Sequence, residues 1–143
     1  MLRIVIDTNI WIRILLRGRV TLPILNLWQN HQFQLITSQA LLDEYDNVWQ
    51  RSRLRKHIDP YQAARLYRQM RSRAEIVELQ TIPPHCRDPK DHPVLATAID
   101  GQANAIVTGD DDLRADDELR RAMAEYGVQL WGVHAFLDAL KNS

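Results

Sequence analysis

Cysteine is nearly absent from this sequence, because Cys86 stands alone among 143 residues. A single thiol excludes an intramolecular disulfide and any zinc site built on several cysteines. Long apolar runs are also missing, since charged residues such as Asp7, Arg13 and Arg17 interrupt the longest apolar stretches well short of the about 20 residues of a membrane span. Together with the lack of a secretory pattern at the N-terminus, these absences predict a cytoplasmic protein that does not associate with a membrane.

Net charge is missing as well, because 18 lysines and arginines balance 18 aspartates and glutamates. The charge of the whole chain therefore gives no support to nucleic-acid binding. The charges are nevertheless segregated: residues 51–73 contain eight basic residues and one acid, and residues 85–119 contain nine acids and three basic residues. The basic segment is either a solvated helix face or a rim that follows phosphates, and the sequence leaves both interpretations open.

The length and the 45% hydrophobic fraction are typical of one globular domain, which we expect to span residues 1–143. Short apolar runs predict strands at residues 2–6, 33–37, 75–79, 105–108 and 128–130. Helical periodicity and capping residues predict helices at residues 9–16, 23–30, 38–50, 60–73, 91–102, 118–126 and 133–140. This alternation predicts an α/β fold, a three-layer α/β/α sandwich with a central, mostly parallel five-stranded sheet.

Acidic residues follow the predicted strands at the points where a parallel sheet collects its functional groups. Asp7 directly follows the first strand, Asp110 and Asp112 follow the fourth, and Asp91 opens the helix before that strand. Glu44 lies in the helix after the second strand. Five crowded carboxylates repel one another unless a cation lies among them, and oxygen ligands without histidine or cysteine favour Mg²⁺ or Mn²⁺ over zinc.

Each acid also has a simpler interpretation when it is considered alone. Asp7, Asp91 and Asp110 could each cap the helix that follows, and Glu44 could be a surface residue. Their joint placement at strand ends is what favours a functional site.

Four segments resemble the motifs of PIN-domain nucleases: RIVIDTN at residues 3–9, SQALLDE at 38–44, RDPKDHPVLATA at 87–98 and AIVTGDDDL at 105–113. They occur in the order found in that family and span most of the chain. The sequence is most similar to the small, single-domain VapC-like group of toxin components in toxin–antitoxin modules. The resemblance implies an acidic quartet with a fifth acid and two polar supports, which here are Asp7, Glu44, Asp91, Asp110, Asp112, Asn9 and Thr108.

One position departs from the family pattern. Pro93 stands two residues after Asp91, where the helix of the family usually continues without proline. The ligand could therefore be Asp88 or Asp91, and the spacing to the apolar residue Val94 favours Asp91.

The function implied by the resemblance is a metal-dependent phosphodiesterase, specifically an endoribonuclease that prefers single-stranded RNA and leaves 3′-hydroxyl and 5′-phosphate ends. Asp7, Asp91 and Asp110 would ligate Mg²⁺ or Mn²⁺. Glu44 and Asp112 would orient the attacking water or hold a second ion, and the number of ions stays open.

Candidate contacts to RNA come from basic and aromatic side chains. We expect a basic groove to be formed by some of six arginines: Arg13, Arg17, Arg51, Arg53, Arg65 and Arg68. Trp11, Trp49 and Tyr61 are candidates for stacking on bases, although packing in the core is the alternative for each of them.

Other functions and partners remain open at this stage. A PIN scaffold that binds RNA or protein without catalysis is one alternative; an aspartate-nucleophile phosphoryl-transfer enzyme is another, although Asn9 stands where one such class has a second aspartate. The resemblance implies a cognate antitoxin as a partner. A homodimer is also predicted, because apolar residues are abundant in the two first helices: Trp11, Ile14, Leu15, Leu22, Leu25 and Trp28.

Overall fold

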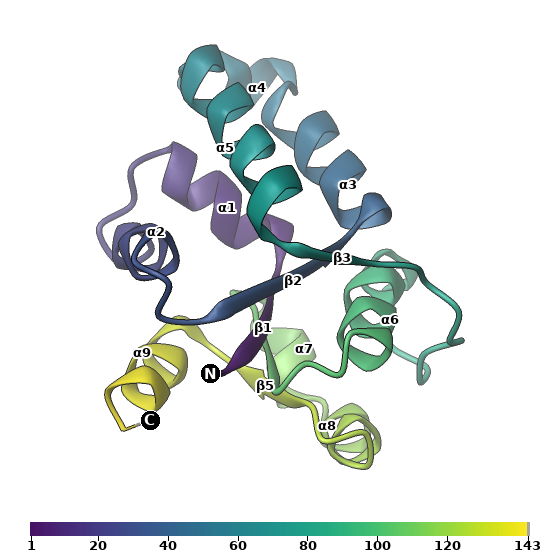
Figure 1. Cartoon of the computed structure of the whole chain (residues 1–143). Coiled ribbons are helices and arrows are strands. Elements are labelled where there is room, and N and C mark those ends of the chain that lie inside the picture. The colour runs from purple at the N-terminus through teal and green to yellow at the C-terminus, as the bar shows by residue number, and fades with distance from the viewer. Residues whose placement is uncertain (143) are drawn as a thin grey trace.

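The computed structural model describes residues 1–142 and contains a central five-stranded sheet (Figure 1). Its strands are β1 (Arg3–Ile6), β2 (Gln34–Ser38), β3 (Glu75–Val77), β4 (Ala105–Val107) and β5 (Gln129–Trp131). Their order is β3-β2-β1-β4-β5, and every neighbouring pair is parallel. The first strand of the chain is therefore the central strand of the sheet.

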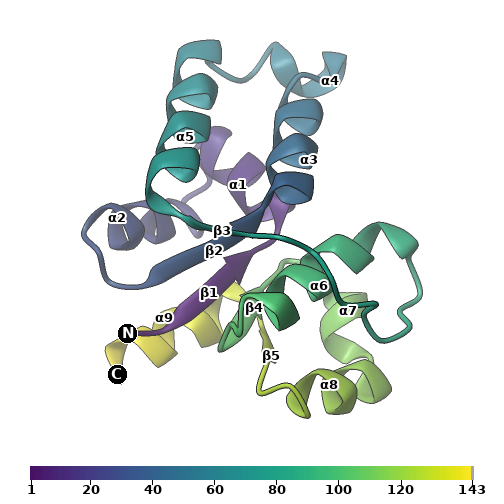
Figure 2. The same ribbon diagram turned by 45° about the vertical axis from the view of Figure 1, so that its right-hand side comes forward.

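Helices form the connections between the strands and cover both faces of the sheet (Figure 2). Across residues 1–142 they are α1 (Thr8–Leu15), α2 (Leu22–Gln29), α3 (Gln39–Trp49), α4 (Ser52–Arg55), α5 (Pro60–Arg73), the 3₁₀ helix η1 (Pro89–Asp91), α6 (His92–Asp100), α7 (Asp111–Ala115), α8 (Asp117–Ala124) and α9 (Val133–Lys141). The predicted three-layer α/β/α sandwich is confirmed, and its sheet is parallel throughout. No helix in this part of the chain is long and apolar enough to cross a membrane.

The alternation of side chains along β1 divides the interior into two apolar clusters. Ile4 and Ile6 point into the cluster formed with α1, α2, α5 and α9, whereas Val5 points into the cluster formed with α6, α7 and α8. All three side chains are at most 3% exposed. A parallel sheet buried on both faces requires such continuous apolar strands, which is why this short segment was recognisable in the sequence.

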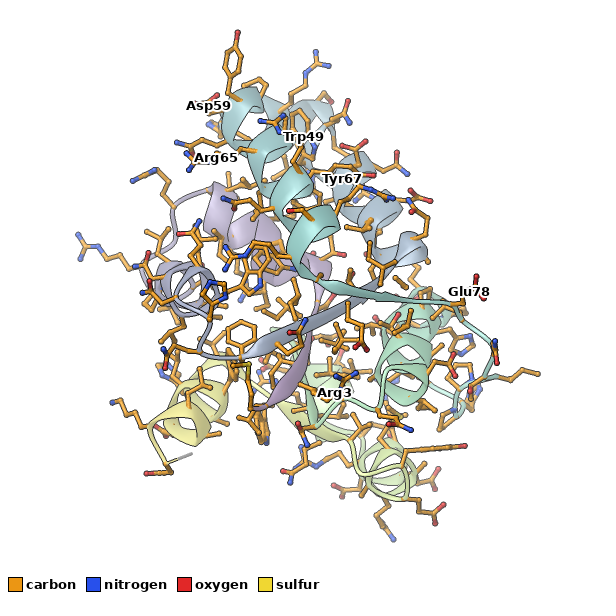
Figure 3. All side chains as sticks on the ribbon, viewed as in Figure 1. Arg3, Trp49, Asp59, Arg65, Tyr67 and Glu78 are labelled. Carbon is orange, nitrogen blue, oxygen red and sulfur yellow. The ribbon has the colours of Figure 1, made fainter. Side chains whose placement is uncertain are left out.

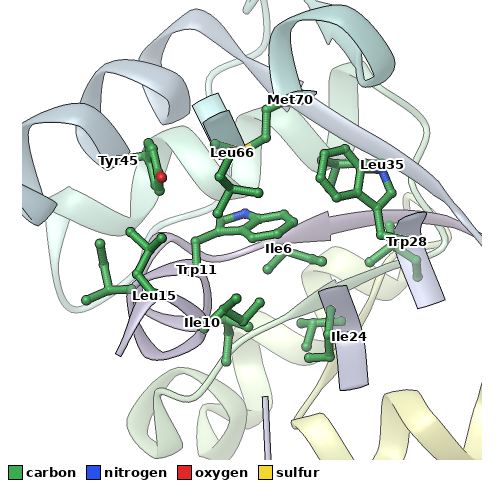
Figure 4. Close-up of a cluster of buried hydrophobic side chains, with 14 of the residues drawn as sticks. Ile6, Ile10, Trp11, Leu15, Ile24, Trp28, Leu35, Tyr45, Leu66 and Met70 are labelled. Atoms are coloured by element: carbon green, nitrogen blue, oxygen red, sulfur yellow. The ribbon is translucent and has the colours of Figure 1, made fainter. Parts of the chain in front are cut away.

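The tryptophans of the first two helices belong to the larger of these clusters (Figure 4). Trp11 and Trp28 are 4% and 2% exposed, and their rings meet edge to face with centroids 5.5 Å apart. The guanidinium of Arg73 lies 5.1 Å from the ring centroid of Trp28 and donates to the carbonyls of Trp28 and Gln29 at the end of α2. Most of the apolar side chains that suggested a dimer surface are therefore core residues, since only Leu22 and Leu25 of that group are half-buried.

Capping side chains explain where several helices begin. Ser38 Oγ accepts a hydrogen bond from the amide of Leu41 at the start of α3. The carboxylate of Asp59, which is labelled in Figure 3, accepts a hydrogen bond from the amide of Tyr61 at the start of α5. Both caps match the helix starts expected from the sequence.

Two short helices, α4 and α7, differ from the sequence prediction. The sequence patterns predicted no helix at residues 51–59 or at residues 109–117, with the next helix beginning only at residue 118. Instead, Asp110 Oδ1 accepts the amides of Asp112 and Leu113 and starts α7, and Asp116 then caps α8 through the amide of Leu119. Successive acidic caps thus divide this segment into two short helices.

Candidate active site

Asp7 and Asp110 meet at the edge of the sheet where the parallel strands β1 and β4 end. The amide of Asp7 donates to the carbonyl of Val107 at 2.9 Å, which extends the pairing of the two strands by one residue. Beyond it, the buried Thr108 hydroxyl donates to Asp7 Oδ2 at 2.8 Å and accepts the amide of Asp110 at 3.1 Å. One hydroxyl therefore positions two acids that come from opposite ends of the sequence.

The Asp7 carboxylate is 9% exposed, and it is not hydrogen-bonded as a helix cap although it directly precedes α1. Burial raises the pKa of this carboxyl, and the nearby Asp110 raises it further. The Thr108 hydroxyl and the backbone amides of Thr8 and Asn9 act in the opposite direction, but the pKa remains raised. A buried carboxylate next to a second carboxylate destabilises the fold by itself. This placement is typical of a functional group and not of a stabilising cap.

Asp91, at the junction of η1 and α6, interacts electrostatically with Asp7 and Asp110. Burial raises the pKa of its carboxyl to about 6, and repulsion from Asp7, Asp110 and Asp88 contributes to the rise. Asp88 is instead exposed and uses its carboxylate to cap η1 through the amide of Lys90. The structure therefore favours Asp91 over Asp88 as the acid that faces Asp7 and Asp110.

Glu44 approaches the group from α3, which follows β2. Burial raises the pKa of its carboxyl, and the negative charges of Asp7 and Asp91 raise it further. Arg51 and the Thr8 hydroxyl act in the opposite direction. On sequence alone, Arg51 was a candidate only for RNA binding and Thr8 had no role of its own, so neither residue was identified as a partner of Glu44.

An acidic cleft of 670 Å³ is lined by Asp91 and Asp110 but not by Asp7 or Glu44, and among the described residues Arg87 is its one basic lining residue. Its polar lining is dominated by carboxylates: Asp88, Asp91, Asp110, Asp112, Asp116, Asp117 and Glu118. Asp112 is exposed in this cleft, as expected for the fifth acid. Asn9 differs from Thr108, because its side chain is exposed and makes no hydrogen bond within residues 1–142, so only Thr108 acts as a polar support in this arrangement.

The donor set fits a hard divalent cation. All of the converging side chains are carboxylates. Among the described residues, no group of three or more Asp, Glu, His or Cys side chains lies close enough together to surround a metal ion directly. Mg²⁺ tolerates this spacing because it keeps several waters and needs only one or two direct carboxylate ligands. Burial is the main cause of the raised pKa values of Asp7, Glu44 and Asp91, and mutual repulsion adds to it. A cation among these groups would favour their ionised forms and so offset both effects.

Of the six arginines considered for RNA binding, the structure brings two to the rim of the site. Arg13 packs against Gly109 between Thr108 and Asp110, and Arg51 lies close enough to influence Glu44. Arg17 and Arg65 instead line a groove between α1, α2 and α5.

The other RNA-binding candidates lie apart from the acids. Arg53 on α4 and Arg68 on α5 are exposed, and neither is among the residues that line the acidic cleft. Trp11 and Trp49 are buried in the core, so they are not available to stack on bases, whereas Tyr61 is 87% exposed.

The PIN domain family model matches residues 3–112 of this chain. The matched segment contains strands β1 to β4 and all five acids of the predicted site, from Asp7 to Asp112. The chain belongs to the PIN domain family. PIN domains have a nuclease-type fold, are generally hydrolases of nucleic acids and typically use divalent metal ions. The comparison with curated proteins gave no significant match.

Repulsion among the acids makes a prediction about stability in metal-free buffer. Because the pKa of Asp91 is raised above its unfolded value, the folded state binds the proton more tightly, and the free energy of unfolding falls as pH rises from about 4 to about 6. The substitution Asp91→Asn should flatten this dependence and raise the melting temperature at pH 7.5 by about 3 °C, after allowance for solvent screening.

The measurement is calorimetric unfolding in EDTA between pH 4 and pH 8. Asp138→Asn, on the exposed side of α9, is the matched control and should leave the pH profile unchanged. A melting temperature of Asp91→Asn that is lower than that of the unsubstituted protein at pH 7.5 would contradict the repulsion account.

Proposed function

We propose that this protein is a Mg²⁺- or Mn²⁺-dependent endoribonuclease that prefers single-stranded RNA. The observation that carries this proposal is the convergence of Asp7, Glu44, Asp91 and Asp110 at one edge of the sheet, where burial and mutual repulsion raise the pKa values of Asp7, Glu44 and Asp91. Such a group is unfavourable for folding and becomes favourable when it holds a cation and a phosphate.

The residues divide into two roles. Asp7, Asp91 and Asp110 would hold the ion, and Thr108 keeps two of these carboxylate segments in place through its hydroxyl. When bound, the ion supplies Lewis-acid stabilisation of the phosphate charge and lowers the pKa of water. Glu44, with its raised pKa, is suited to accept the proton of the attacking water, and Asp112 orients that water from the exposed side of the cleft.

Hydrolysis by this arrangement would leave 3′-hydroxyl and 5′-phosphate ends. The acids alone repel a polyanion, so RNA binding needs positive charge at the rim of the cleft. Arg13 and Arg51 supply it at the positions described above.

Two alternative functions of the site have less support. A PIN scaffold without activity would not need the buried Asp7, whose desolvation is costly, and all five acids are present. An aspartate nucleophile would need free access to phosphate, whereas Asp7 is 9% exposed and one of its oxygens is held by Thr108.

The RNA-cleavage proposal predicts that Asp7→Asn and Asp110→Asn each reduce the cleavage rate of unstructured RNA by at least about 100-fold. Loss of a residue that only orients a metal ligand costs about 10- to 100-fold, so a direct ligand should cost at least as much. The assay measures product formation in Mg²⁺ or Mn²⁺, with mass spectrometry of the product ends. Asp138→Asn serves as the matched control and should cleave normally.

Three results would refute the proposal. They are the absence of metal-dependent cleavage by the unsubstituted protein, full activity in EDTA, or full activity of Asp7→Asn. The first of these results would favour the scaffold that binds RNA without cutting it.

We also propose that the protein acts in the cytoplasm as the toxin of a toxin–antitoxin module, as a homodimer that receives a cognate antitoxin. Support comes from a groove of 450 Å³ between α1, α2 and α5, whose apolar lining includes the half-buried Leu22 and Leu25, with Arg17 and Arg65 at its polar side. Sedimentation at micromolar concentration should give a species near twice 16.7 kDa. A monomer at that concentration would contradict the dimer.

A further inference from the structure

A second pocket lies directly beside the acidic cleft, at the ends of β4 and β5 near the start of α9. It has a volume of 380 Å³, and we call it the basic pocket because Arg13 from α1 and Arg114 from α7 both line it. Residues 108–112 separate it from the acidic cleft: Thr108, Gly109 and Asp111 line the basic pocket, whereas Asp110 and Asp112 line the acidic cleft. The two pockets therefore share one wall.

The guanidinium groups of both arginines lie close to the backbone of a glycine. A Cβ added to Gly109 would be 2.7 Å from Arg13 Nη1, and a Cβ added to Gly132 would overlap Arg114 Nη1. Gly132 has φ −79° and ψ 177°, a conformation that any residue adopts, so its backbone does not require glycine. What glycine provides at both positions is space for a guanidinium group in the wall of the pocket.

The pocket contains more hydrogen-bond donors than acceptors. Within residues 1–142 the guanidinium of Arg13 makes no hydrogen bond or ion pair, and Nε of Arg114 is buried without a partner. The first amides of the nine-residue helix α9 also open here, with no side-chain cap on Gly132. The only carboxylate in the lining is Asp111, which pairs with Arg114 but is itself 89% exposed.

We infer that the basic pocket binds a phosphodiester group of the RNA strand, at a linkage adjoining the one that is cut in the acidic cleft. This inference rests on the proposed function. Guanidinium groups bind phosphate through paired hydrogen bonds, and the amides at the start of α9 add donors and a favourable dipole. His134, which also lines the pocket, adds a further donor at its exposed side.

The shared wall gives this pocket a role in positioning the substrate. A strand that crosses residues 108–112 has one phosphate among the acids, which attract it only through a cation, and the next phosphate among fixed positive charges. The Arg13 and Arg114 contacts would therefore set which linkage lies over Asp7 and Asp110. Neither arginine touches the reacting atoms in this arrangement, so both are positioning residues.

The first arm of the test measures binding without cleavage. Fluorescence anisotropy of a labelled, short oligouridylate in EDTA should show that Arg13→Gln and Arg114→Gln each weaken binding about 10-fold at low salt, as expected for losing a charge-assisted hydrogen bond. The slope of log affinity against log salt should fall by about 0.7 for each lost phosphate contact. Arg121→Gln, which removes an exposed arginine from α8, is the matched control and should bind within twofold of the unsubstituted protein.

Gly132→Ala keeps every charge and tests the geometry of the pocket. The new methyl group displaces the Arg114 guanidinium while the backbone conformation remains allowed, so binding should weaken and the far-ultraviolet circular dichroism spectrum should not change. This variant and Arg13→Gln keep the test decisive if Arg114→Gln does not fold.

The second arm locates the phosphate. In Mn²⁺, an oligonucleotide with one neutral methylphosphonate linkage next to a normal cleavage position should be cut more slowly there by the unsubstituted protein, through a higher KM. Arg13→Gln should show no additional loss on that substrate, because the contact is already absent. If the methylphosphonate linkage and Arg13→Gln each slow cleavage by the same factor whether or not the other is present, the assignment is overturned.

Two further results would also overturn the inference. One is unchanged RNA binding by Arg13→Gln and by Gly132→Ala. The other is inorganic phosphate that binds with dependence on Arg13 and Arg114 while RNA binding does not depend on them, since the pocket would then hold a free phosphate. The first arm needs no cleavage, so it tests the pocket independently of the nuclease activity. If RNA binding depends on the pocket but the protein does not cleave RNA, the inference about the pocket stands and the proposed function is refuted.

Discussion

The parallel pairing of β1 with β4 is the constraint on which the site depends. It places Asp7 beside a threonine 101 residues further along the chain, and the Thr108 hydroxyl then fixes both the Asp7 carboxylate and the amide of Asp110. The strands are buried on both faces, so this edge cannot shift without disturbing two apolar clusters. The rigidity of the sheet is what holds two negative charges together against their repulsion.

That repulsion connects stability with function. Burial and mutual charge raise the pKa values of Asp7, Glu44 and Asp91, which means that the fold keeps these groups ionised at a cost near neutral pH. Sites of this kind are retained when they bind something that removes the cost. On the other side of residues 108–112 the charge is reversed, with Arg13 and Arg114 short of partners. A divalent cation on one side and a phosphodiester on the other would complement both.

The sequence was sufficient for the fold because the strands and helices follow local patterns, and the same patterns located the candidate acids near strand ends. Apolar runs ending in an acid marked β1 and β4, and the order of strands and helices required a parallel sheet. The spacing to Val94 already favoured Asp91 over Asp88, and the structure adds the physical reason, which is the electrostatic interaction of Asp91 with Asp7 and Asp110. The basic pocket could not be predicted, because the approach of Arg114 to Gly132 arises only from tertiary packing. Likewise, a count of tryptophans could not separate core from surface, and the structure places Trp11 and Trp28 in the core.

The most direct test of the central claim is the melting temperature of the metal-free protein at pH 7.5 as Mn²⁺ or Mg²⁺ is added. Ligands that bind only the folded state stabilise it in proportion to the logarithm of their concentration, by about 2.7 kcal/mol at 100 times the dissociation constant. The account predicts a rise that continues with the logarithm of the cation concentration, is lost in Asp7→Asn and persists in Asp138→Asn. A melting temperature that does not change with either cation would contradict the assignment of these carboxylates as a divalent metal site.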